Sequence, residues 1–183
     1  SSNKCLEGAP GLGFCIASES AMIKTEGNSP SLVLDLYDQW RAMQKTKQWR
    51  FTPPTHVILA FAQAIKEFEA EGNVTGRGGR YRKNYGILVS GMRDMGFKTL
   101  LPDELQAPII VTFHMPTNPE FDFDQFYDGL RDQGYVIYPG KLTVANSFRI
   151  GCIGRLDHEH MEGALNAIKG MIEAFGITQI SND

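Results

Sequence analysis

The stretch SSNKCLEGAPGLGF, residues 1–14, contains a lysine at position 4 followed by three glycines and one proline. Glycine permits positive φ and proline fixes φ, so this composition predicts a tightly specified turn beside Lys4. Residues 12–17, which follow the turn, are predicted to form a short buried strand. A turn specified this closely at the first residues leads us to expect that part of the protein precedes Ser1.

The composition is that of an ordinary globular protein. The 183 residues are 42% apolar and 21% charged, which suits one domain or slightly more with a sizeable core. The net charge of −3 gives no reason to expect nucleic acid or an anionic membrane as a partner. No apolar run approaches the roughly 20 residues of a transmembrane helix. The three cysteines form no CxxC pair, which favours reduced thiols and a cytoplasmic location.

The first part of the chain is predicted to be helical. Residues 31–43 carry apolar side chains at helical spacing. Pro53 and Pro54 cannot lie inside a helix, but Thr55 can cap one that ends near Gly72. The apolar face of this second helix is formed by Ile58, Phe61, Ala62, Ile65 and Phe68.

A third helix is predicted over residues 73–95, and we place a domain boundary near residue 73. Strands are then expected in APIIVTFHM (107–115), YVIYPG (135–140) and SFRIGCIG (147–154), and helices in DFDQFYDGLRDQG (122–134) and DHEHMEGALNAIKGMIEAFG (157–176). Asp124 and Asp157 are the expected N-caps of these helices, and Gly134 is the expected terminator of the first. The order β, α, β, β, α predicts a small α+β domain, with an antiparallel sheet and helices on one face.

Two motifs have ordinary structural interpretations. Gly8 and Gly13 have the spacing of a phosphate-binding P-loop, but Phe14 stands where that loop requires lysine. His158 and His160 in DHEH are two residues apart, so on a helix they face different sides. A turn and a helix start are therefore favoured over a nucleotide site and a metal site.

Lys4 is the candidate nucleophile. A lysine beside a tight turn and free of carboxylate neighbours can bond covalently to an aldehyde cofactor. The ordinary alternative is a solvated surface charge, because an exposed lysine is protonated and a poor nucleophile at neutral pH.

Arg149 and Thr52 are candidate binding residues. Arg149 lies between Phe148 and Ile150, and an arginine in an apolar strand calls for an anionic partner such as a carboxylate or phosphonate. The alternative is an arginine on the solvent face of an edge strand. The Thr52 hydroxyl, near a helix N-terminus, can hold a phosphate, with turn chemistry as the default.

Five segments, taken in order, resemble the 2-aminoethylphosphonate–pyruvate aminotransferases, class V members of the fold-type I pyridoxal-phosphate enzymes. They are SSNKCLEGAPGLGF, SLVLDLYDQW, WRFTPPTHVILAFAQA, GYVIYPGK and FRIGCIG. The resemblance covers essentially all 183 residues. It implies an α/β fold and the C-terminal half of a chain about twice this length. Residues 1–73 would then end the large cofactor domain, and residues 74–183 would form the small domain.

The resemblance also implies roles for the candidate residues. Lys4 would bind pyridoxal 5′-phosphate covalently and then act as general base and acid in proton transfer. Thr52 would reach the cofactor phosphate across the interface of a homodimer, and Arg149 would hold the acidic group of the substrate. The implied reaction converts 2-aminoethylphosphonate and pyruvate to phosphonoacetaldehyde and L-alanine, within phosphonate catabolism.

Some features depart from the family pattern. The family's cofactor-pairing aspartate, ring-stacking aromatic residue and phosphate-binding turn would all precede Ser1, and Cys152 stands where a polar residue such as asparagine is expected. The alternatives are a serine–pyruvate or alanine–glyoxylate aminotransferase and, from another class, a non-catalytic folded fragment or dimerisation module. A cysteine desulfurase is disfavoured, because no loop with an obvious catalytic cysteine lies near Arg149.

Residues 95–175 contain a complete β/α pattern with its own apolar faces, whereas residues 1–72 present surfaces suited to packing against a further sheet. We therefore expect amide hydrogen exchange to be slower in residues 95–175 than in residues 1–72. Exchange measured by mass spectrometry on the 183-residue chain tests this. Comparable protection in the two segments would contradict the fragment interpretation.

Overall fold

The computed structural model describes residues 1–140 and 145–181, and the chain divides into two compact units, Ser1–Lys66 and Glu67–Asp183. Lys141, the last residue of the quoted GYVIYPGK, lies outside the described residues. Among the described helices, none has the length and apolar character that crossing a membrane requires.

The first unit contains short helices and few buried apolar side chains. Its helices are α1 (Glu19–Ile23), α2 (Leu36–Thr46) and the larger part of α3 (Thr55–Ala70). Asp35 caps α2, because its carboxylate accepts a hydrogen bond from the amide of Asp38 at 3.0 Å. Residues 31–34, predicted as part of this helix, precede that cap, and neither they nor Asp35 is helical. Thr55 is the first residue of α3 and not its cap, since the amide of Ile58 donates to the carbonyl of Pro54.

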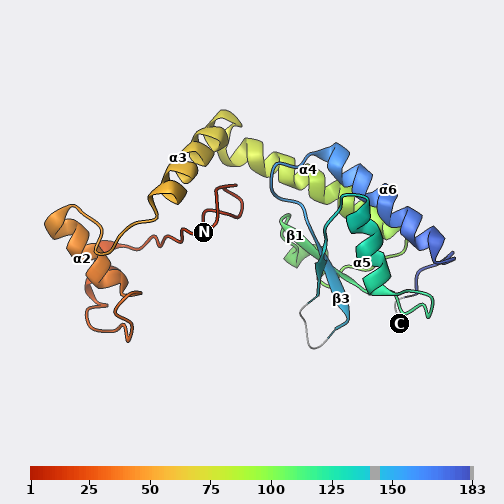
Figure 1. Ribbon diagram of the computed structural model, residues 1–183, viewed down its shortest axis with the longest axis horizontal. Helices are drawn as coiled ribbons and strands as arrows, with labels where there is room; N and C mark the ends of the chain where they lie inside the picture. Colours follow the sequence, from red (N-terminus) through yellow and green to blue (C-terminus); the bar gives the residue numbers. More distant parts are fainter. Residues whose placement is uncertain (141–144, 182–183) are drawn as a thin grey trace. The chain divides into compact units, whose positions relative to one another are not determined.

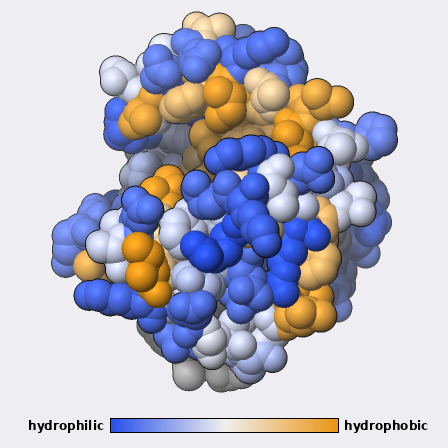
Figure 2. Space-filling model, turned by 90° about the vertical axis from the view of Figure 1, so that its left-hand side faces the viewer, coloured by the Kyte–Doolittle hydropathy of each residue, from blue (hydrophilic) through white to orange (hydrophobic). Residues whose placement is uncertain are grey.

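The buried strand predicted for residues 12–17 is absent. These residues form no regular structure, and residues 13–17 are exposed. A strand needs neighbouring strands for its backbone hydrogen bonds, and residues 1–66 contain none. Large apolar side chains of this unit, among them Ile16 (91% exposed) and Leu34 (77% exposed), are in contact with solvent. Figure 2 shows apolar side chains at the molecular surface, among hydrophilic ones.

The second unit has the predicted β, α, β, β, α order after a long helix. Its elements are α4 (Asn73–Asp94), a short 3₁₀ turn (Asp103–Leu105), β1 (Ile110–His114), α5 (Phe123–Asp132), β2 (Tyr138–Pro139), β3 (Ser147–Gly151) and α6 (His158–Ala174). The strands form an antiparallel sheet in the order β1-β3-β2, with Val111 opposite Ile150 and Tyr138 opposite Arg149. All three strands are shorter than predicted. In Figure 1, α4, α5 and α6 lie on one side of the strands, which confirms the predicted antiparallel sheet with helices on one face.

The N-caps of α5 and α6 are aspartates. Asp122, and not Asp124 as predicted, caps α5, because its carboxylate accepts from the amide of Gln125 at 2.8 Å. Asp124 lies in the first turn, where its charge complements the helix dipole. Asp157 caps α6 as predicted, in a reciprocal capping box with His160. Gly134 has the left-handed φ of 90° that follows a helix end.

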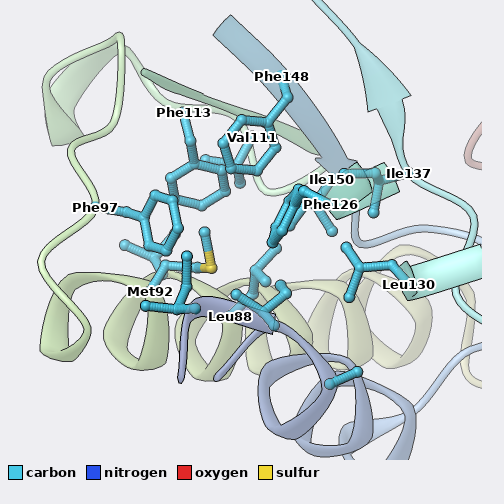
Figure 3. Close-up of a cluster of buried hydrophobic side chains, with 14 of the residues drawn as sticks. Leu88, Met92, Phe97, Val111, Phe113, Phe126, Leu130, Ile137, Phe148 and Ile150 are labelled. Carbon is cyan, nitrogen blue, oxygen red and sulfur yellow. The ribbon is translucent and has the colours of Figure 1, made fainter. Parts of the chain in front are cut away.

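The main hydrophobic core lies between the sheet and the helices of the second unit (Figure 3). Phe113 of β1 and Phe148 of β3 are directly opposite each other, with ring centroids 5.8 Å apart. Helix residues fill the space beneath them. The side chains labelled in Figure 3 are Leu88, Met92, Phe97, Val111, Phe113, Phe126, Leu130, Ile137, Phe148 and Ile150.

The junction of α3 and α4 depends on close backbone packing. Gly72 has a left-handed φ of 93°, which ends the first helix. A Cβ added to Gly76 would collide with the carbonyl oxygen of Glu71, and backbone cannot move aside as a flexible side chain does. Gly86 on the same helix α4 is exposed, and a Cβ there would meet nothing within 4 Å.

We expect Gly76→Ala to lower the free energy of unfolding by about 2–3 kcal/mol, because the added methyl group displaces this junction. The matched variant Gly86→Ala should raise it by about 0.5–1 kcal/mol through helix propensity. Urea unfolding followed by far-UV circular dichroism measures both. Equal stability of the two variants would show that the junction tolerates a Cβ at residue 76.

Candidate functional site

Lys4 lies on a turn that closes on itself through hydrogen bonds. The amide of Ser2 donates to the carbonyl of Leu12 at 3.0 Å, and the amide of Gly8 donates to the carbonyl of Ser2 at 2.8 Å. The buried Ser2 hydroxyl also donates to the carbonyl of Ala9 at 2.6 Å. The backbone on both sides of Lys4 is therefore held in place, while the Lys4 side chain is exposed.

The Lys4 amine has one polar neighbour. Its Nζ donates to Oδ1 of Asn3 at 3.3 Å. Within residues 1–140 and 145–181, Lys4 forms no ion pair with a carboxylate. No anionic side chain of the described chain therefore competes with a ligand for this amine.

The Lys4 turn packs against the first half of α3. A Cβ on Gly8 would lie 3.1 Å from the Phe61 ring, and one on Gly11 would lie 3.2 Å from Val57. The rings of Phe14 and Phe61 stack with centroids 5.9 Å apart. Gly8 and Gly11 therefore let the turn approach this helix closely, which is a structural role.

Thr52 lies just before α3, the helix against which the Lys4 turn packs. Its side chain is exposed, and its hydroxyl forms no hydrogen bond with any described residue. Pro53 and Pro54 lead directly into the helix. The structure thus places Lys4 and Thr52 in one unit, both beside the N-terminal half of α3.

Arg149 lies in the second unit, at the centre of β3. Its chain neighbours Phe148 and Ile150 point into the core, so by strand alternation Arg149 is on the opposite, helix-free face of the sheet. It is half-buried there, between Thr112 of β1 and Tyr138 of β2. Because β3 is the central strand, Arg149 is not on an edge strand.

The donors of the Arg149 guanidinium are mostly unused. Its Nη2 donates to the carbonyl of Pro139 at 3.4 Å. Its Nε is buried and has no acceptor among the described residues, and no carboxylate of that part of the chain pairs with it. A buried donor without an acceptor is unfavourable by about 1–3 kcal/mol. An incoming anion would relieve this cost and use the planar donor set.

A buried polar network supports the segment that follows β3. The Arg80 guanidinium donates to the carbonyls of Gly154 and Leu156, and the Asn84 amide donates to that of Leu156 at 2.9 Å. Glu71 pairs with both Arg77 and Arg80, and the Arg80 guanidinium is the main reason that the pKa of Glu71 falls to about 2. The network ties α4 to the segment between Arg149 and α6.

This network was not predicted from the sequence. The sequence feature that indicates it is the spacing of Arg77, Arg80 and Asn84, which places three polar side chains on one helical face. Cys152, where a polar residue was expected, is fully buried instead. Burial raises the pKa of its thiol to about 12, so this cysteine fills the core in its neutral form.

Comparison with known proteins agrees with the resemblance in the sequence. A 2-aminoethylphosphonate–pyruvate transaminase of Burkholderia lata is 51% identical over 180 residues, which cover 98% of this chain and 48% of the relative. One of Burkholderia mallei is 53% identical over 176 residues, with 96% and 48% covered. The chain is homologous to the 2-aminoethylphosphonate–pyruvate transaminases. It spans about half the length of these transaminases, and it matches no protein-family profile.

Solved structures confirm the predicted fold of this transaminase homologue. The ureidoglycine–glyoxylate aminotransferase of Bacillus subtilis superposes with a TM-score of 0.83 at 22% identity, over 97% of this chain and 47% of that chain. The pyridoxamine–pyruvate aminotransferase of Mesorhizobium loti gives 0.82 at 23% identity, over 98% and 47%. At these identities the likeness shows the fold alone, which is that of part of a fold-type I aminotransferase.

Proposed function

We propose that the protein containing this chain is a pyridoxal-phosphate-dependent aminotransferase that transfers the amino group of 2-aminoethylphosphonate to pyruvate, giving phosphonoacetaldehyde and L-alanine. The observation that carries the proposal is the identity of 51% and 53% to transaminases of this name over nearly the whole chain. The free donors of Lys4, Thr52 and Arg149 support it, because each suits the group it would bind.

The described residues fit the cofactor chemically. An amine without an anionic partner suits an aldehyde, and an unused hydroxyl beside a helix start suits a phosphate. Lys4 and Thr52 are therefore the residues of this chain that would hold pyridoxal 5′-phosphate. The cofactor, when bound, supplies the electron sink that makes the amino-group transfer possible.

The chain's own residues then have three tasks. Lys4 holds the cofactor through Nζ and, once released, its amine moves a proton at the substrate Cα. Thr52 donates its hydroxyl to the cofactor phosphate. Arg149 binds the acidic group that both substrates carry, a phosphonate on the amino donor and a carboxylate on pyruvate.

We also propose the assembly and location that this function entails. Residues 1–73 would complete a cofactor domain and residues 74–183 the small domain, in a homodimer whose interface Thr52 crosses. Cys5, Cys15 and Cys152 are all free thiols, which supports a cytoplasmic protein.

Lys4→Ala, in the gene product that contains these residues, should abolish turnover and leave the fold largely intact, because the exposed side chain makes few contacts. Borohydride reduction followed by mass spectrometry should find cofactor attached in the parent protein and none in the variant. Lys45→Ala, at an exposed position of α2, is the control and should behave like the parent. Retained activity together with retained cofactor attachment would rule out Lys4.

Arg149→Lys in the same protein should lower kcat/KM for both substrates by roughly 30-fold to 1000-fold, or about 2–4 kcal/mol. Lysine keeps the charge but loses the two parallel hydrogen bonds of the guanidinium. Steady-state kinetics with each substrate varied in turn measures the loss, and the resting absorption spectrum should stay unchanged. Arg131→Lys, in an exposed ion pair with Asp128, is the matched control. A loss below about threefold for both substrates would exclude Arg149 as the anion-binding residue.

A further inference from the structure

The guanidinium of Arg149 is held from one side, by β2. Tyr138 lies opposite Arg149 and Pro139 lies opposite Phe148 in the antiparallel register. The hydrogen bond of Arg149 goes to the carbonyl of Pro139 on β2, and among the described residues no hydrogen bond joins its side chain to Thr112 on β1. The strand that sets its direction is only two residues long.

Gly140 keeps this short strand against β3. Its amide donates to the carbonyl of Ser147 at 2.7 Å. A Cβ on Gly140 would collide with that same carbonyl, which is backbone and cannot rotate away. Gly140 does not have a positive φ, so close approach, and not backbone conformation, is the reason for glycine here.

These contacts connect Gly140 to the Arg149 guanidinium in consecutive steps. Gly140 sets the distance between β2 and β3, that distance places the Pro139 carbonyl, and the carbonyl holds one terminal nitrogen of Arg149. The remaining donors of the guanidinium are then directed over the helix-free face of the sheet, where the buried Nε has no acceptor among the described residues.

We propose that Gly140 is a positioning residue for Arg149, which it orients through the carbonyl of Pro139. This inference rests on the proposed role of Arg149 as the residue that binds the acidic group of the substrates. A Cβ at residue 140 moves β2 outward and releases the guanidinium from its carbonyl. Binding of both acidic substrates then weakens, while the cofactor stays attached at Lys4.

The test uses Gly140→Ala in the gene product that contains these residues. The variant should lose about tenfold in kcat/KM for 2-aminoethylphosphonate and for pyruvate, mostly through a higher KM, as expected for one lost hydrogen bond. Borohydride trapping of the cofactor should remain as in the parent. Gly151→Ala is the matched control. Gly151 lies on the same face of β3 as Arg149, and a Cβ there meets nothing within 4 Å. Its kcat/KM should stay within about threefold of the parent.

A double variant separates positioning from general damage to the sheet. If Gly140 acts through Arg149, then Gly140→Ala combined with Arg149→Lys should be no worse than Arg149→Lys alone, within about threefold. Losses that multiply would overturn the proposal, and so would an unchanged KM in Gly140→Ala. If Arg149→Lys itself has no effect, the anion-binding role fails first, which is a distinguishable result.

A second variant keeps the test valid if Gly140→Ala does not fold. An ester bond between residues 139 and 140, introduced by semisynthesis, makes the Pro139 carbonyl a weaker acceptor and also removes the Gly140 amide that donates to Ser147, without adding a Cβ. This protein should also show a severalfold higher KM for both acidic substrates. An unchanged KM in the ester protein would overturn the proposal.

Discussion

The arrangement of strands and helices in the second unit depends on the packing of Phe148. Its ring lies within 5.7–6.2 Å, centroid to centroid, of four other phenylalanine rings, contributed by β1, α5 and the segment after α4. Aromatic clusters of this kind combine large buried area with preferred ring geometry, so they specify one arrangement of strand and helices. Because strand residues alternate between faces, burial of Phe148 places Arg149 on the helix-free face. A shift of β3 by one residue would bury the guanidinium in an apolar core, at a high cost in free energy.

A polar layer complements this core on the α4 side. Arg77 is 2% exposed, and a buried guanidinium is tolerated only with a counter-charge, which Glu71 supplies at 2.7 Å. Glu71 also binds Arg80, which holds the carbonyls of the segment between β3 and α6. Protonation of Glu71 would remove that counter-charge. Its pKa lies below the ordinary value, so its contribution to stability is complete above about pH 4.5 and is lost as the pH falls toward 2.

The two units differ in how they support their candidate site residues. Arg149 lies on a strand whose other face is packed in the main core. Lys4 and Thr52 instead lie beside one helix, in a unit whose only buried apolar residues are Tyr37 and Ala64 among those described. The Lys4 turn is ordered by its own hydrogen bonds and by the contacts of its glycines with α3. Backbone hydrogen bonds thus hold the segment around Lys4 in place, whereas side-chain packing holds the strand that carries Arg149.

Sequence periodicity by itself determined the helix over residues 73–95, the β, α, β, β, α order and the Asp157 cap, because these depend on local spacing and on residues next to each other in the chain. Five short segments that in their order resemble one aminotransferase family also pointed to Lys4, Thr52 and Arg149. Only the tertiary structure decided that residues 12–17 are not a strand, since a strand exists only where another strand accepts its hydrogen bonds. It also decided that Asp122 caps α5, that Glu71 neutralises two arginines, and that Arg149 faces away from the helices. The choice of Asp122 over Asp124 is local, but both are aspartates that suit an N-cap, so residue type does not distinguish them. The missing strand, the ion pairs of Glu71 and the direction of Arg149 depend on groups beyond the neighbouring residues or on which face of the sheet is covered, and local sequence carries no information about either.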